Sequence, residues 1–430
     1  MRRGALVSLA LLGALACRAK KPAAADPAAA MRELALIKVE GDLPVDAMLR
    51  RLRAAAQHNP AKAENWIELG NAWVRKARDS ATPAYYRIAD ACAEVALGLS
   101  PHNRLALDLR GLALMNDHRF EEARRLEQSI VDVEPSDAMA WGTLSDALLE
   151  LGRTGEAAQA MQRMMDLKPN LPSYSRAAHI LWLRGDVAGA KEAVRLAIDA
   201  GADSRDLEPR AWVIVQAAQI FWNEGDLDGA EAGYDRALQD VADFAPALAG
   251  KGQVALARGD ARAAVRLLLA AYRRSPLVST LWLLGDARLA AGDTQSAEEV
   301  YQRIGRQGGN DPRTLALFLA TKDRERERAL QLAEAERTVR DDQYTEDAWA
   351  WALYRADRLA EARAASDRAT QLGTRDAKLL YHAGAIRLAA GEAQGRKLVL
   401  RALALNPHFD LTGASEARRL LGEHELARRR

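Results

Sequence analysis

Apolar residues recur along this chain at spacings of three, four and seven, which place them on one face of an α-helix. Trp141, Leu144 and Leu148 form one such apolar stripe. Gly152 then marks a tight turn, and a second helical stripe runs until Pro169. Because proline cannot continue a helix, the pattern predicts two amphipathic helices joined by a short turn.

The same helix pair is repeated along most of the chain, with an alanine in its second helix at nearly constant spacing. Successive members of this series are 34, 33, 40, 34, 33, 32 and 33 residues apart, and they are Ala123, Ala157, Ala190, Ala230, Ala264, Ala297, Ala329 and Ala362. Aspartates that follow the turn glycines are placed to cap the second helix, and they are Asp186, Asp226, Asp260 and Asp293. Because no single pair could bury its apolar stripe alone, the pairs must stack on one another.

This period and these residue types resemble the tetratricopeptide repeat, a helix-turn-helix unit with the pattern W-x2-L-G-x2-Y, then A-x3-F, then P. The resemblance implies an all-α fold, a right-handed α-solenoid of about ten repeats over residues 61–408. An open stack needs polar ends for solubility. We therefore expect a capping helix at 45–60 and a second capping helix with a basic tail at 409–430.

Residues 1–16 have the pattern of a signal peptide, with Arg2 and Arg3 before an apolar run that is too short to span a membrane. The run ends at Cys17, and this junction resembles a bacterial lipoprotein signal, in which the cysteine becomes the acylated first residue. Residues 17–44 are then expected to form the lipidated cysteine and a flexible tether.

The lipoprotein resemblance also implies a location in the cell envelope. In a Gram-negative cell it implies the periplasmic face of the outer membrane, because Arg18 is not the aspartate that retains lipoproteins at the inner membrane. The membrane would be contacted through the lipid anchor only. Residues 14–16, Ala-Leu-Ala, also fit an ordinary cleavage site, which leaves a soluble secreted or periplasmic protein as the alternative.

Composition excludes several classes of function. The chain has 61 Lys and Arg against 59 Asp and Glu, so its net charge of +2 gives no reason to expect a nucleic acid partner. Cys17 and Cys92 are too few for a disulfide framework or a cysteine zinc site. No phosphate-binding loop, zinc-protease or nucleophile-elbow motif occurs. We therefore expect no enzymatic activity, no cofactor, no metal and no small-molecule substrate.

Function is then expected on the concave surface that the first helices line in the tetratricopeptide family. The candidate residues lie on a second stripe of these helices, offset from the packing stripe. The predicted groove for a peptide or helix consists of His179, Trp182, Trp212, Gln219, Trp222, Gln253, Trp282, Asp286, Trp351 and Tyr381. A Trp side chain joins a large apolar face to one hydrogen-bond donor, which suits this kind of recognition. The alternative is that each Trp packs against the next repeat.

These observations predict an exported, lipid-anchored protein-protein interaction scaffold that binds a partner in the cell envelope. In its narrower form, the prediction is a protein that aids assembly of a cell-surface or secretion complex. One alternative is a regulatory or substrate-recruiting subunit of a separate enzyme such as a glycosyltransferase, because similar repeats precede some catalytic domains. Another is a purely structural spacer. The fold supports many functions, so the resemblance does not identify the partner.

Overall fold

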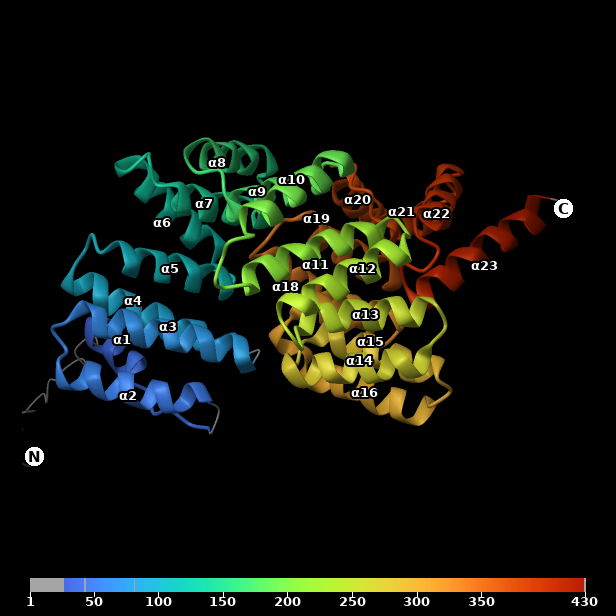
Figure 1. The fold of residues 1–430 in the computed structure, drawn as a ribbon. Helices are drawn as coiled ribbons and strands as arrows, with labels where there is room; N and C mark the ends of the chain where they lie inside the picture. The colour runs from blue at the N-terminus through green and yellow to red at the C-terminus, as the bar shows by residue number, and fades with distance from the viewer. Residues whose placement is uncertain (1–26, 42–43, 81, 429–430) are drawn as a thin grey trace, which may run out of the picture.

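The computed structural model describes residues 27–41, 44–80 and 82–428, which fold into a stack of α-helices without strands. Figure 1 shows the stack winding as a solenoid, with the first repeats in blue and the last in red. The predicted signal peptide and Cys17 lie outside the described residues. Within the described part of the chain, no helix combines the length and the apolar composition that crossing a bilayer requires.

Ten helix pairs form the repeats of the described chain. They are α3 (Ala63–Ser80) with α4 (Ala84–Leu99), α5 (Arg104–Asn116) with α6 (Phe120–Val133), α7 (Ala138–Glu150) with α8 (Thr154–Leu167), α9 (Leu171–Leu183) with α10 (Val187–Ala200), α11 (Glu208–Asn223) with α12 (Leu227–Asp240), α13 (Ala245–Ala257) with α14 (Ala261–Arg274), α15 (Val278–Ala290) with α16 (Thr294–Gln307), α17 (Pro312–Thr321) with α18 (Arg326–Arg337), α19 (Gln343–Arg355) with α20 (Leu359–Thr370), and α21 (Ala377–Ala389) with α22 (Gln394–Leu405). A short 3₁₀ turn, η1 (Gly308–Asn310), precedes the eighth pair. The predicted α-solenoid of about ten repeats is confirmed.

The series of repeat alanines lies at the contact between paired helices. All eight side chains, from Ala123 to Ala362, are at most 1% exposed. A small residue at this position lets the two helices of a pair approach closely. The spacing that predicts the fold is therefore also the spacing of its closest helix contacts.

The turns inside the repeats need a backbone with positive φ. Glycine supplies it at Gly152 and Gly292, among others, while His118, Asp323 and Asp357 adopt it where the repeat has no glycine. The aspartates after the glycines cap the second helices as predicted. Their carboxylates accept backbone N–H groups at the starts of α10, α12, α14 and α16, at 2.9 to 3.1 Å.

Three further helices flank the repeats: α1 (Pro27–Ala35), α2 (Pro44–His58) and α23 (Leu411–Arg428). The helix α1 falls inside the expected tether and corrects it, because α1 packs against α4. Ala35 is fully buried, and Met31 and Leu34 contact the core of the first repeat. Small alanines and a few spaced apolar residues are enough for this docking, although they look like linker composition in the sequence. The helix α2 lies where the N-terminal capping helix is expected, and α23 lies at the C-terminal end of the stack (Figure 1).

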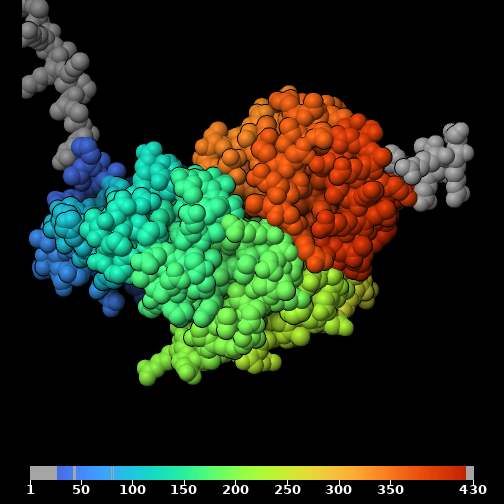
Figure 2. Space-filling model, turned by 90° about the horizontal axis from the view of Figure 1, so that it is seen from above, coloured from blue at the N-terminus to red at the C-terminus, as the bar shows by residue number. Residues whose placement is uncertain are grey.

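Repeats 3 to 5 touch the segments that begin repeats 9 and 10 and helix α23. We call this contact the seam. Three hydrogen bonds define it, each made to a carbonyl near the end of a first helix: Asp341 N–H donates to Glu150 O at 2.9 Å, the Thr374 hydroxyl donates to Leu183 O, and the Asn406 amide donates to Trp222 O at 2.7 Å. Figure 2 shows the orange and red C-terminal repeats lying directly against the green middle repeats. Successive superhelical turns are therefore joined along one edge of the solenoid.

Glycine makes the close approach at the seam possible. A Cβ atom added to Gly185 would lie 2.5 Å from the carbonyl oxygen of Gly373, and one added to Gly152 would lie 2.5 Å from that of Asp341. Gly292 occupies the same turn position in repeat 7, with φ +83°, but a Cβ there would meet no atom within 4 Å. The turn glycines thus have two roles, and only those of repeats 3 to 5 serve the seam.

We predict that Gly185→Ala destabilises the protein more than Gly292→Ala. Both changes place a side chain at positive φ, which costs about 1–2 kcal/mol, but only the new methyl group at position 185 would also push against a facing carbonyl. Urea unfolding followed by circular dichroism should show an additional loss of about 1 kcal/mol or more for Gly185→Ala. Small-angle scattering should show a larger radius of gyration for that variant alone. Equal losses in the two variants would mean that the seam contributes nothing to stability.

Candidate functional site

The structure places the predicted groove residues in two different environments. Six of them are packed inside the protein, with 1% to 7% exposure: Trp182, Trp222, Trp282, Asp286, Trp351 and Tyr381. Gln219 and Gln253 are half-buried, and His179 is exposed. Trp212 is 51% exposed. The expectation that the whole set lines an open surface therefore needs correction, because the packed side chains present almost no area to a partner.

Contacts with later repeats explain why the tryptophans are buried. The Trp182 indole N–H donates to the Tyr344 hydroxyl at 3.4 Å, across the two superhelical turns. The Trp282 ring meets Phe318 edge-on with 5.4 Å between centroids. The Trp351 ring stacks on His382 at 4.0 Å. Packing against later repeats, the alternative that the sequence left open, describes these rings.

Two of the polar members are also engaged. Asp286 forms an ion pair with Lys322 at 2.7 Å and accepts a hydrogen bond from the Tyr301 hydroxyl. Burial raises the pKa of Asp286, while the positive charge of Lys322 opposes that change. The Tyr381 hydroxyl donates to Glu416 at 2.8 Å. Both groups are held inside the C-terminal repeats.

A cavity of about 210 Å³ lies beside these residues, on the first helices of repeats 8 to 10. Its lining residues are Arg313, Thr314 and Leu317 from α17, Tyr344 and Asp347 from α19, and Asp376, Lys378 and Leu379 from the start of α21. Tyr344 connects this cavity to Trp182, and the Lys378 ammonium lies 5.0 Å from the ring centroid of Trp282. The predicted stripe thus borders the cavity, although different side chains line it.

Sequence reasoning missed the lining residues, although one signal for them was available. Asp347 stands 15 residues before the repeat alanine Ala362. Trp282 stands at the same distance from Ala297, and Ser175 from Ala190. The stripe that selects Trp282 in repeat 7 therefore selects Asp347 in repeat 9. The residues in the first turns of α17 and α21 lie outside that stripe and carried no such signal.

The two basic side chains of the cavity are already neutralised. Arg313 Nη1 lies 3.1 Å from a carboxylate oxygen of Asp342, and Lys378 Nζ lies 3.0 Å from one of Asp410. Burial works against the charge of Lys378, but the charge of Asp410 raises its pKa above the ordinary value. Neither Asp342 nor Asp410 lines the cavity. The cations are thus held by acids outside it.

His179 shows that the inner surface near the cavity is enclosed and still reachable. Its side chain is exposed to solvent, yet the surrounding protein lowers its pKa by desolvation. Asp146 and Asp342 act in the opposite direction. Because Asp146 lies in repeat 3 and Asp342 begins repeat 9, His179 senses both superhelical turns. Such an environment is expected on a concave wall.

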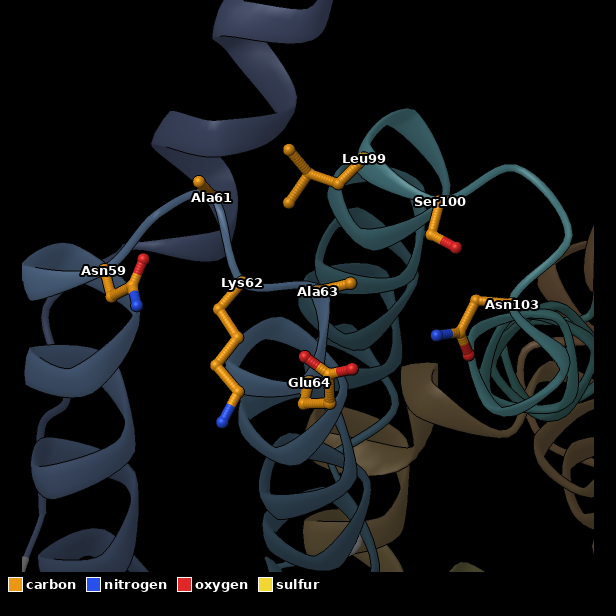
Figure 3. A pocket seen from close by; sticks show the side chains of 8 residues that line it. All are labelled: Asn59, Ala61, Lys62, Ala63, Glu64, Leu99, Ser100 and Asn103. Carbon is orange, nitrogen blue, oxygen red and sulfur yellow. The ribbon is translucent and has the colours of Figure 1, made fainter.

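A second, wider pocket of about 410 Å³ lies at the first repeat (Figure 3). Its side chains come from the connection between α2 and α3 and from the connection between α4 and α5. Asn103, one of them, caps α5 by accepting the N–H of Ala106 at 3.2 Å. No predicted site residue borders this pocket. Within the residues that the structure describes, no three His, Cys, Asp or Glu side chains gather as a metal site would require.

Comparison with known proteins gives a consistent result for the fold. The family model of the tetratricopeptide repeat matches residues 109–172, 215–278 and 249–312. A search of curated proteins gave no match. Three similar solved structures are PilW, a type IV pilus biogenesis factor (16% identity, TM-score 0.41, 48% of this chain and 94% of that chain), PilF of Pseudomonas aeruginosa (13%, 0.40, 47% and 91%) and a human IFIT1 dimer with PPP-AAAA (16%, 0.45, 88% and 95%). With TM-scores below 0.5, these similarities say nothing about the partner of this chain.

We predict very different stability effects for two tryptophans of the same predicted stripe. Trp351→Ala should cost about 3–5 kcal/mol of unfolding free energy, because it removes a fully packed ring. Trp212→Ala should change that free energy by no more than about 0.5 kcal/mol, because the ring is largely exposed. Urea unfolding of the two variants beside the wild type measures both values. A large loss for Trp212→Ala would show that this ring is part of the packing.

Proposed function

Because the chain is a tetratricopeptide repeat protein, we propose that it is a scaffold that binds a segment of a protein partner on its inner surface. Repeat folds of this kind typically act as non-catalytic scaffolds with concave binding surfaces. The observation that carries the proposal is the cavity on α17, α19 and α21, which opens among the first helices of repeats 8 to 10. Solvent-exposed His179 supports access to the same inner wall.

The bound segment is extended in this proposal. An α-helix with its side chains is about 10–12 Å wide, whereas the cavity holds only about 210 Å³. The seam joins the superhelical turns on one side of the inner surface, which leaves little freedom to widen it. An extended peptide that inserts one side chain fits these limits better than a docked helix.

We further propose that the protein is exported and anchored in the cell envelope through Cys17. The support for this location comes from the sequence of residues 1–17 alone. The partner would then be an envelope protein. A role in assembling a cell-surface or secretion complex is the narrower form of the proposal, and it depends on the same export signal.

Filling the cavity should prevent partner capture. Thr314→Trp places a large ring among the lining residues, and Gln162→Trp on the exposed face of α8 is the matched control. Mild crosslinking in native membranes, affinity capture and mass spectrometry should show at least a roughly tenfold loss of one partner with Thr314→Trp only. Thermal unfolding must first show that both variants are folded. Equal capture by the two variants would place the binding surface elsewhere.

Replacing Cys17 should release the protein from membranes. Cys17→Ala removes the sulfur atom that would carry the lipid, whereas Cys92→Ala changes a buried thiol inside the first repeat. After fractionation, Cys17→Ala should appear in the soluble fraction and Cys92→Ala should remain with membranes. If Cys17→Ala also stays in the membrane fraction, the anchor is not this cysteine.

A further inference from the structure

The charges around the cavity on α17, α19 and α21 are unevenly satisfied. Arg313 and Lys378 each have a carboxylate partner outside the cavity, at 3.1 and 3.0 Å. The two acids that line the cavity, Asp347 and Asp376, do not pair with these cations. The lining therefore has two neutralised cations and two carboxylates that need other partners.

Asp376 has the least satisfied of these carboxylates. Its Oδ1 accepts the backbone N–H groups of Lys378 at 2.8 Å and Leu379 at 3.2 Å, which caps α21. Among the described residues, no cationic side chain lies within ion-pair distance of it. Burial raises the pKa of Asp376, and the negative charge of Asp347 raises it further. A positive charge arriving in the cavity would stabilise this carboxylate.

Asp347 adds a second acceptor on the neighbouring helix. Its carboxylate faces His382 Nδ1 at 2.9 Å, and it is only 5% exposed. The imidazole of His382 stacks on Trp351, so its position is fixed by packing. The two carboxylates thus approach the cavity from α19 and from the start of α21.

The rest of the lining is suited to an apolar stem. Leu317, Leu379 and the ring of Tyr344 contribute carbon surface, and Thr314 contributes a small half-buried side chain. A long basic side chain buries its methylene groups along such a surface while its charged head meets acids. An acidic side chain would instead meet Asp347 and Asp376 and would have to displace Arg313 or Lys378 from existing ion pairs.

We propose that this cavity takes a lysine or arginine side chain of the partner segment, with its charged head at Asp376 and Asp347 and its stem against Leu317 and Leu379. This inference rests on the proposed function, because it specifies which residue of the extended segment the inner surface recognises. The remainder of the segment lies along the inner wall.

The test uses two pools of fluorescein-labelled peptides, acetylated and amidated at their ends, with uncharged random flanks and either lysine or norleucine at the centre. Norleucine keeps the apolar stem and lacks the charge. Fluorescence anisotropy with the full chain should show the lysine pool binding about tenfold or more tightly, which corresponds to one charge-assisted hydrogen bond. Added salt should weaken the lysine pool selectively.

Asp376→Asn is the informative variant, because Asn caps a helix start as well as Asp does and removes only the negative charge. It should reduce the preference for lysine to about threefold or less, with unchanged thermal unfolding. Asp166→Asn is the matched control, since Asp166 is an exposed acid of α8 that accepts a hydrogen bond from Gln162. It should keep the full preference.

Each other outcome overturns a defined part of the argument. If both pools bind the wild type equally, the inner surface binds peptides but the cavity does not select a cation. If the preference survives Asp376→Asn, the cation binds at another site. If neither pool binds and Thr314→Trp also leaves partner capture unchanged, the proposed peptide-binding function fails together with this inference.

Discussion

The close approach of the turn glycines in repeats 3 to 5 to the backbone of the later repeats is the constraint on which the rest of the structure depends. At Gly185 and Gly152 the facing atom is a main-chain carbonyl, so a side chain could not be accommodated by a rotamer change. The approach fixes where repeats 9 and 10 lie relative to repeats 3 to 5. It thereby buries Trp182 beneath Tyr344 and encloses the inner surface next to the cavity.

The local architecture could be predicted because each repeat contacts mainly its neighbours. Apolar spacing gave the helices, the repeat alanines gave the contact within each pair, and Asp186 and its counterparts gave the helix starts. The seam could not be predicted in this way. Gly185 and Gly373 are 188 residues apart by number, and their contact depends on small rotations accumulated over the repeats between them. No local pattern in the sequence records that sum.

The same limit explains the site. Helical spacing correctly placed Trp182, Trp282 and Trp351 on first helices, but whether such a ring is exposed is decided by whatever packs on it from later in the chain. Asp347 stood on the predicted stripe and was overlooked because the reasoning followed aromatic residues. Asp376 and Lys378 were out of reach, since they belong to the first turn of α21, which meets α17 and α19 only in the folded stack.

The position of Asp376 combines two opposing requirements in one carboxylate. As the cap of α21 it satisfies two backbone N–H groups and stabilises the helix start. As a buried acid beside Asp347 it carries a charge that the surrounding protein disfavours, shown by its raised pKa. Asparagine would cap equally well without that cost, so stability alone does not account for aspartate here. A residue that lowers stability at a reachable cavity, on walls held rigid by the seam, is what a preorganised binding site requires, because a partner then gains the missing interaction without ordering the site.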